Sequence, residues 1–122
     1  MKGKIQIFEF WSKEVGNMNI VTKFLVDLVQ RIGMTPHGYP QVIPYPKENL
    51  GNTVISSFVA YQPLYESYVV FDNWVDLNYA NLVVNSCKDY DSSIVEQTII
   101  EHFACEEVRS LEPVFYTGEK EV

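Results

Sequence analysis

Residues 65–87, YESYVVFDNWVDLNYANLVVNSC, decide the fold of this chain. Its two halves, YESYVVFDNW and NYANLVVNSC, are rich in β-branched and aromatic residues, which favour strands. The few residues between them predict a turn centred near Leu77, so that the two strands pair as an antiparallel hairpin. A regular hairpin with this centre places Ser67 directly opposite Cys87, and opposed side chains share one face. The spacing thus allows a hydroxyl and a thiol to face one pocket. The pattern alone favours an interpretation without chemistry, because a serine at a strand start and a buried cysteine are both common.

The flanking sequence predicts further strands and two helices from the spacing of its apolar residues. The first helix can be capped by Asn17 or Asn19 and ended by Gly33 in a left-handed conformation. The second helix is expected to start with a capping box made by Ser93 and Glu96. The expected strands are Lys4–Trp11, Asn52–Gln62, Tyr65–Trp74, Asn78–Cys87 and Glu106–Tyr116, with a break at Pro63–Leu64, and the expected helices are Asn19–Met34 and Ser92–Ala104.

Only two helices are available to cover at least five strands. This predicts a single domain, residues 1–122, with an α+β fold: a two-layer sandwich of a mainly antiparallel sheet with both helices on one face. The proline-rich segment TPHGYPQVIPYPKENLG allows a turn and an edge strand at most. The second face of the sheet then needs cover, and a homodimer could supply it. The eight Tyr, seven Phe and two Trp suit either such an interface or an ordinary core.

The composition excludes several classes of protein. The formal charge of −7 argues against binding to nucleic acid or to an anionic membrane, where basic patches supply the affinity. No apolar stretch approaches the ~20 residues that span a bilayer, and the amino-terminal MKGKIQIFEFW is a poor signal peptide. The two cysteines, Cys87 and Cys105, make no disulfide framework. We therefore expect a cytoplasmic protein with reduced thiols.

The sequence also lacks the patterns of metal sites and of common hydrolases. Its two histidines, His37 and His102, pair with no cysteine or carboxylate at a recognised ligand spacing, so no metal is expected. Neither a glycine-rich phosphate loop nor the G-x-S-x-G elbow is present. The hairpin with Ser67 and Cys87 is therefore the remaining candidate site.

This hairpin carries a longer pattern that resembles the signature of the prokaryotic S-adenosylmethionine decarboxylases. That signature runs Glu-Ser-His-x-x-x-His-Thr-Trp-Pro-Glu-His-x-Tyr-Ala and has a cysteine twenty positions after the serine. The matching residues here are Glu66, Ser67, Trp74, Tyr79, Ala80 and Cys87. The flanks FLVDLVQRIGMTPHGYP and CKDYDSSIVEQTIIEHFACEEV are also similar to segments of that family, so the resemblance covers nearly the whole chain.

The resemblance implies a self-cleaving, pyruvoyl-dependent decarboxylase of S-adenosylmethionine, or of a related small amine, that serves spermidine synthesis and forms a homodimer. In such a protein the hydroxyl of Ser67 attacks the carbonyl of Glu66, the resulting ester eliminates, and a pyruvoyl group is left on the new amino terminus. This group is an electron sink for decarboxylation, and Cys87 protonates the product. The resemblance also implies three substrate-binding residues: Asp76, which would bind the ribose hydroxyls, Trp74 and Tyr68.

Several positions depart from the family pattern among the residues that assist cleavage. The histidine five positions after the serine, the base in the eliminating step, is Asp72 here. A carboxylate is a weaker base than imidazole at neutral pH, unless burial raises its pKa. Asp72 is also five residues from Ser67, so the two side chains point to opposite faces of an unbroken strand. Other replaced positions are Tyr68, Asn73, Val75 and Leu77, and the family's upstream serine falls at Val59, with Ser56 and Ser57 out of register.

Two hypotheses therefore stay open. The chain is an active pyruvoyl enzyme, or it is an uncleaved homologue that keeps the fold as a binding or regulatory partner. The intact mass separates them, because a self-cleaved chain gives the two pieces 1–66 and 67–122.

Overall fold

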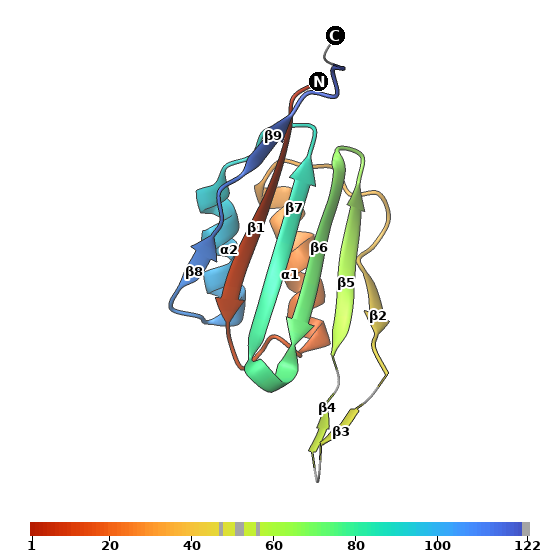
Figure 1. The fold of residues 1–122 in the computed structure, drawn as a ribbon, viewed down its shortest axis with the longest axis vertical. Helices are drawn as coiled ribbons and strands as arrows, with labels where there is room; N and C mark the ends of the chain where they lie inside the picture. Colours follow the sequence, from red (N-terminus) through yellow and green to blue (C-terminus); the bar gives the residue numbers. More distant parts are fainter. Residues whose placement is uncertain (47, 51–52, 56, 121–122) are drawn as a thin grey trace.

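The main sheet is antiparallel throughout and has the strand order β2-β5-β6-β7-β1-β8, with β9 also pairing with β1. The computed structural model describes residues 1–46, 48–50, 53–55 and 57–120. Figure 1 shows α1 and α2 together behind this sheet, while β3 and β4 form a small separate hairpin that extends from its end. The elements of the described residues are β1 (Gly3–Trp11), α1 (Met18–Arg31), β2 (Gln41–Pro44), β3 (Glu48–Leu50), β4 (Thr53–Ile55), β5 (Phe58–Leu64), β6 (Ser67–Trp74), the 3-10 turn η1 (Val75–Leu77), β7 (Tyr79–Ser86), α2 (Ser92–Phe103), β8 (Val108–Ser110) and β9 (Val114–Tyr116). The predicted α+β sandwich with two helices on one face is confirmed.

The register of the β6–β7 hairpin differs from the prediction by one residue. The strands are connected by η1 and by Asn78, which is left-handed with φ of 51°. The connection therefore has four residues, 75–78, and its centre lies between Asp76 and Leu77 instead of on Leu77. Ser67 consequently pairs with Ser86, and the prediction that it lies directly opposite Cys87 is wrong.

The first helix begins and ends as its sequence predicts. Of the two possible caps the structure uses Asn17, whose side-chain oxygen accepts hydrogen bonds from the N–H groups of Asn19 (3.1 Å) and Ile20 (3.2 Å). These bonds satisfy N–H groups that have no partner inside the helix. Beyond the last turn Gly33 adopts φ of 73°, which a residue without a Cβ does at no steric cost.

The second helix is capped two positions earlier than predicted, by Asp91 instead of Ser93. The carboxylate of Asp91 accepts hydrogen bonds from both the N–H and the hydroxyl of Ser93, at 2.9 Å and 2.7 Å. The predicted capping box of Ser93 and Glu96 is therefore wrong, because the aspartate already holds the first turn. Glu96 instead accepts a hydrogen bond from the hydroxyl of Ser110 at 2.6 Å, which ties α2 to β8.

Several predicted strand boundaries also need correction. Pro63 and Leu64 do not interrupt the strand, because both residues belong to β5 and the turn follows them. The predicted strand Glu106–Tyr116 is two short strands, β8 and β9, which pair with different parts of β1. Pro113 lies between them and cannot donate a ladder hydrogen bond. The proline-rich segment contributes the edge strand β2, as expected, but it also forms β3, which exceeds the prediction. Asn52 and Ser56 of the predicted strand 52–62 lie outside the described residues, and its described residues are divided between β4 and β5, which belong to different sheets.

The core lies between the helices and one face of the sheet. Alternate residues of the central strands are buried there against the apolar stripe of each helix. The largest fully buried side chains are six phenylalanines, Phe8, Phe10, Phe24, Phe58, Phe71 and Phe103. Figure 1 shows no helix in front of the sheet, so within the described residues the second face stays open.

Candidate functional site

The predicted cleavage site lies in the tight turn between β5 and β6. Leu64 pairs with Ser67, so the turn has two residues, Tyr65 and Glu66. Both have negative φ, whereas the two-residue turns that match the twist of a hairpin have positive φ at one or both positions. The departure comes at the next residue, because Ser67 has φ of 151°, a value that residues with a Cβ rarely adopt. The backbone is therefore strained at Ser67, the residue that follows the peptide bond to be cleaved.

A segment that follows α1 holds this turn from outside the hairpin. The carbonyl of Thr35 accepts a hydrogen bond from the N–H of Tyr65 at 3.0 Å. The N–H and the hydroxyl of Thr35 donate to the two carboxylate oxygens of Glu66, at 2.8 Å and 3.1 Å. These bonds, the backbone one first, hold the pKa of the Glu66 carboxyl below its usual value. The ring of His37 stacks on that of Tyr65, with 4.9 Å between centroids.

The carbonyl group of Glu66 is itself hydrogen-bonded. Its oxygen accepts from the backbone N–H of Cys87, with an N···O distance of 2.8 Å. A donor at this oxygen stabilises the negative charge that develops there when a nucleophile attacks the carbonyl carbon, as in an oxyanion hole. The site therefore combines a serine in a strained backbone conformation with an N–H donor at the carbonyl that the serine would attack. The sequence pattern assigns only the thiol of Cys87 to this chemistry.

Ser67 and Cys87 lie at the same end of the β6–β7 hairpin but on different sides of the site. Ser67 is half-buried on the helix-facing side of β6, opposite the fully buried Ser86. Cys87 follows β7 by one position and is exposed. Its residue lines a pocket of about 460 Å³, whose other lining residues are Lys2, Gly3, Lys4, Asp89 and Phe115.

The pocket beside Cys87 carries two lysines and one carboxylate. The ammonium of Lys4 is buried and donates to the carbonyl of Tyr90 at 3.0 Å and to the hydroxyl of Ser92 at 2.9 Å. It also lies 3.9 Å from the carboxylate of Asp89. With Lys2 at the rim, the lining has an excess of positive charge in a chain of formal charge −7. Such a lining favours a small ligand that carries a carboxylate.

Asp72 lies away from the cleavage site. It belongs to the open face of the sheet, where it pairs with Val59 of β5 and Asn81 of β7. Five residues of strand separate it from Ser67, which is a distance of about 16 Å. Burial raises the pKa of its carboxyl, although a hydrogen bond from the N–H of Asn73 acts in the opposite direction. The raised pKa makes Asp72 a stronger base than an ordinary aspartate, but the structure does not bring it to Ser67.

The neighbouring Asn73 has a structural role. Its side chain is buried, with only 2% exposure. The amide oxygen accepts from the N–H of Phe58 at 2.8 Å, and the amide nitrogen donates to the carbonyl of Val15 at 2.8 Å. Asn73 thereby joins the start of β5 to the loop that precedes α1, and it points away from any site on the open face.

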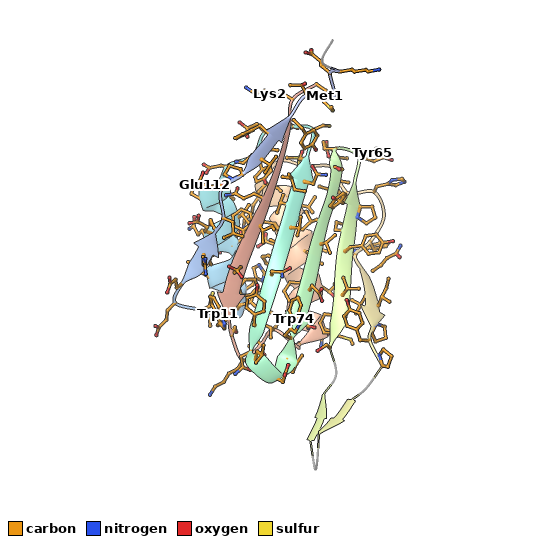
Figure 2. All side chains as sticks on the ribbon, in the orientation of Figure 1. Met1, Lys2, Trp11, Tyr65, Trp74 and Glu112 are labelled. Atoms are coloured by element: carbon orange, nitrogen blue, oxygen red, sulfur yellow. The ribbon has the colours of Figure 1, made fainter. Side chains whose placement is uncertain are left out.

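The three predicted substrate contacts are spread along β6 and beyond it. Tyr68 is exposed on the open face at the cleavage end of the strand. Figure 2 shows Trp74 at the opposite end of the sheet from Tyr65; Trp74 is six residues, or about 20 Å of strand, from Tyr68. Asp76 is exposed in η1, farther still. Within one chain these residues do not form a single pocket with the cleavage turn.

The described residues contain neither a metal-binding cluster nor a membrane span. No group of three or more His, Cys, Asp or Glu side chains is placed among them to hold a metal ion. His102 is engaged with Asp27, with 2.7 Å between Nε2 and Oδ2, where α2 contacts α1. No helix in this part of the chain is long and apolar enough to cross a bilayer.

The sequence prediction missed two residues at the site, Thr35 and Ser86. Thr35 is 31 positions from Glu66, and no sequence signal connects them. Ser86 would be found by counting a four-residue connection, which moves it into the place predicted for Cys87. Ser86 donates to the sulfur of Met34 at 3.3 Å and accepts from the N–H of Lys88 at 3.0 Å, so its hydroxyl is already engaged.

Comparison with known proteins finds a likeness in structure but none in sequence. No protein-family model matches the chain, and no curated protein matches it. The structure is similar to the crystal structure of the adenosylmethionine decarboxylase from Aquifex aeolicus VF5, with a TM-score of 0.66 and 12% sequence identity. The likeness covers 98% of this chain and 95% of that chain. The chain therefore shares the fold of an adenosylmethionine decarboxylase over its whole length.

Proposed function

We propose that the protein is a pyruvoyl-dependent, S-adenosylmethionine decarboxylase-like enzyme that cleaves itself between Glu66 and Ser67. The observation that carries this proposal is the backbone geometry and hydrogen bonding on either side of that peptide bond. Ser67 follows the turn with a left-handed φ of 151°, and the carbonyl of Glu66 accepts a hydrogen bond from the N–H of Cys87. Strain in the reactant and a donor at the developing oxyanion both lower the barrier to attack on this carbonyl.

The cleavage follows from the residues of the turn. Ser67 Oγ attacks the carbonyl carbon of Glu66, its proton passes to the leaving nitrogen, and the peptide C–N bond is exchanged for an ester. A base then removes the α-proton of residue 67 and the Cβ–Oγ bond breaks, so that Oγ leaves with Glu66 as part of its new α-carboxylate and residue 67 becomes dehydroalanine. Water replaces nitrogen at the resulting dehydroalanine, ammonia leaves, and residue 67 becomes the pyruvoyl group. That group supplies the electron sink for decarboxylation.

The pocket beside Cys87 is our candidate for the substrate site. Its volume of about 460 Å³ suits a small amine, either S-adenosylmethionine or a related amino acid. Lys2 offers a charge for the substrate carboxylate, and the exposed thiol of Cys87 is available as the proton donor. The role in spermidine synthesis and the cytoplasmic location stay predictions from the sequence.

The intact mass of freshly purified protein tests the proposal. The self-cleaved protein gives the fragments 1–66 and 67–122, and the second fragment carries a carbonyl that reacts with hydroxylamine. Ser67→Ala is the control, since it keeps the fold and removes the nucleophile, and it should stay whole. A wild-type chain of single, uncleaved mass with no reactive carbonyl overturns the proposal.

The placement of Asp72 favours a second candidate function. If Asp72 is the only replacement for the missing base, its distance of about 16 Å from Ser67 leaves elimination without assistance. The chain is then an uncleaved homologue that binds a ligand or regulates a partner. This candidate predicts an intact chain, no release of carbon dioxide and assembly with an active relative; rapid spontaneous cleavage at Glu66 excludes it.

We further propose that a second copy of the chain covers the open face of the sheet. That face carries exposed apolar and aromatic side chains, among them Ile7, Trp11 and Trp74, of the kind enriched at interfaces. Light scattering should give the mass of a dimer, and Ile7→Lys should shift it to a monomer. Val26→Lys is the matched control, because Val26 is similarly exposed, 43% against 38%, but lies on α1. Equal effects of the two changes contradict this interface.

A further inference from the structure

Thr35 lies in the segment that runs from α1 to β2, and this segment follows the end of β5. Pro36 forms a bridge with Leu64, and the N–H of His37 donates to the carbonyl of Pro63 at 2.9 Å. These contacts bring Thr35 against the cleavage turn, where it makes three hydrogen bonds, one to Tyr65 and two to the Glu66 carboxylate. A residue outside the hairpin therefore determines the position of the turn.

The two bonds from Thr35 fix the side chain of Glu66, and the bond from the N–H of Cys87 fixes its carbonyl oxygen. Rotation of the peptide that follows Glu66 would break at least one of these contacts. Attack within the turn requires the serine oxygen at about 3–3.5 Å from the carbonyl carbon in an aligned approach, and loss of about 1 Å in position can cost 10²-fold in rate. A short turn held only by its own strand ends would not provide this alignment.

We propose that Thr35 is a positioning residue for self-cleavage: it acts through Glu66 and holds the carbonyl of Glu66 where Ser67 attacks it. This inference rests on the proposed function and adds to it the element that orients the reacting peptide. Thr35 itself touches no reacting atom. Because Thr35 is exposed, its hydroxyl contributes little to the stability of the fold, so the effect of its loss should appear in the rate of cleavage.

The test compares the rates of fragment formation by Thr35→Val, Thr35→Ser and the wild type, measured by intact mass during refolding of the full chain. Thr35→Val keeps the shape and the backbone bonds but removes the hydroxyl donor, so cleavage should slow by about tenfold or more. Thr35→Ser restores the donor and should cleave within about threefold of the wild type. Thr98→Val is the matched control, because it removes a threonine hydroxyl bound to the carbonyl of Ile94 at 2.7 Å inside α2.

Thermal midpoints of the same threonine variants in a Ser67→Ala background separate positioning from stability, because that background cannot cleave. Slow cleavage by Thr35→Val with rescue by Thr35→Ser, and an unchanged midpoint, supports the proposal. Wild-type cleavage by Thr35→Val overturns it and leaves self-cleavage standing. The proposal is also overturned if Thr35→Val and Thr98→Val both cleave more slowly and the slowing is proportional to the loss in thermal midpoint in both variants. A wild-type chain that stays whole overturns this inference together with the proposed function.

Discussion

The strain at Ser67 leads to a stability prediction that does not depend on any activity. Its φ of 151° lies where residues with a Cβ rarely occur, and holding a residue in such a region costs about 1–3 kcal/mol. Glycine adopts this region freely but loses more backbone entropy on folding, which costs about 0.5–1 kcal/mol. Ser67→Gly should therefore raise the free energy of unfolding by roughly 0.5–2 kcal/mol over a variant with a Cβ at the same position.

The fitting reference is Ser67→Ala, because both variants lack the hydroxyl and neither can cleave. For a chain of 122 residues, 1 kcal/mol shifts the thermal midpoint by about 3–5 °C. Ser67→Gly should thus melt about 2–8 °C above Ser67→Ala in calorimetry, with the same order in urea unfolding. A glycine variant that melts at or below the alanine variant refutes the strain, and with it one of the two arguments for cleavage at this peptide.

Three further predictions concern the stability of the fold that holds the site. Asn73→Leu leaves the N–H of Phe58 and the carbonyl of Val15 without partners and should lower the free energy of unfolding by about 2–4 kcal/mol in urea unfolding. A change below about 1 kcal/mol contradicts the structural role of the Asn73 hydrogen bonds. Asn17→Ala removes the cap of α1 and should cost about 1 kcal/mol in the same assay; an unchanged urea midpoint means that the cap contributes nothing. The hydrogen bond from His102 is the first cause that lowers the pKa of Asp27, so the stabilisation by this carboxylate is present above its unfolded pKa and is lost as pH falls through the lower, folded value. Asp27→Asn should therefore reduce the urea midpoint at pH 6, and the reduction should shrink as the pH falls below the ordinary aspartate value of 3.8. A difference that stays constant with pH contradicts this assignment.

The strands and helices of the chain were predictable because they depend on local patterns. The apolar spacing of α1 and the turn residue Gly33 act within a few positions, and both are where the sequence places them. The capping box of α2 failed for an equally local reason, since Asp91 offers a carboxylate one residue before the expected helix start. Local rules found the elements and erred by a residue or two at most of their ends, but they missed that the predicted strands 52–62 and 106–116 are each divided in two.

The candidate site depended on quantities that no local pattern contains. The Glu-Ser pair and the distant cysteine were visible in the sequence, but the register between them turned on whether the connection held an odd or an even number of residues. One residue of register moves every side chain of a strand to the other face. Cys87 thus became the donor to the Glu66 carbonyl through its backbone, and Ser86 took the predicted place opposite Ser67.

The sequence by itself determined the α+β class and the cover of one sheet face by two helices, because periodicity and composition act along the chain. The peptide between Glu66 and Ser67 was singled out only by the resemblance of the sequence to the S-adenosylmethionine decarboxylases. Only the tertiary structure decided that Thr35 holds Glu66, that Asp72 lies about 16 Å from Ser67 and that the strain falls on Ser67 itself. These facts come from contacts between segments tens of residues apart, and such contacts exist only once the sheet has paired and the helices have packed on it.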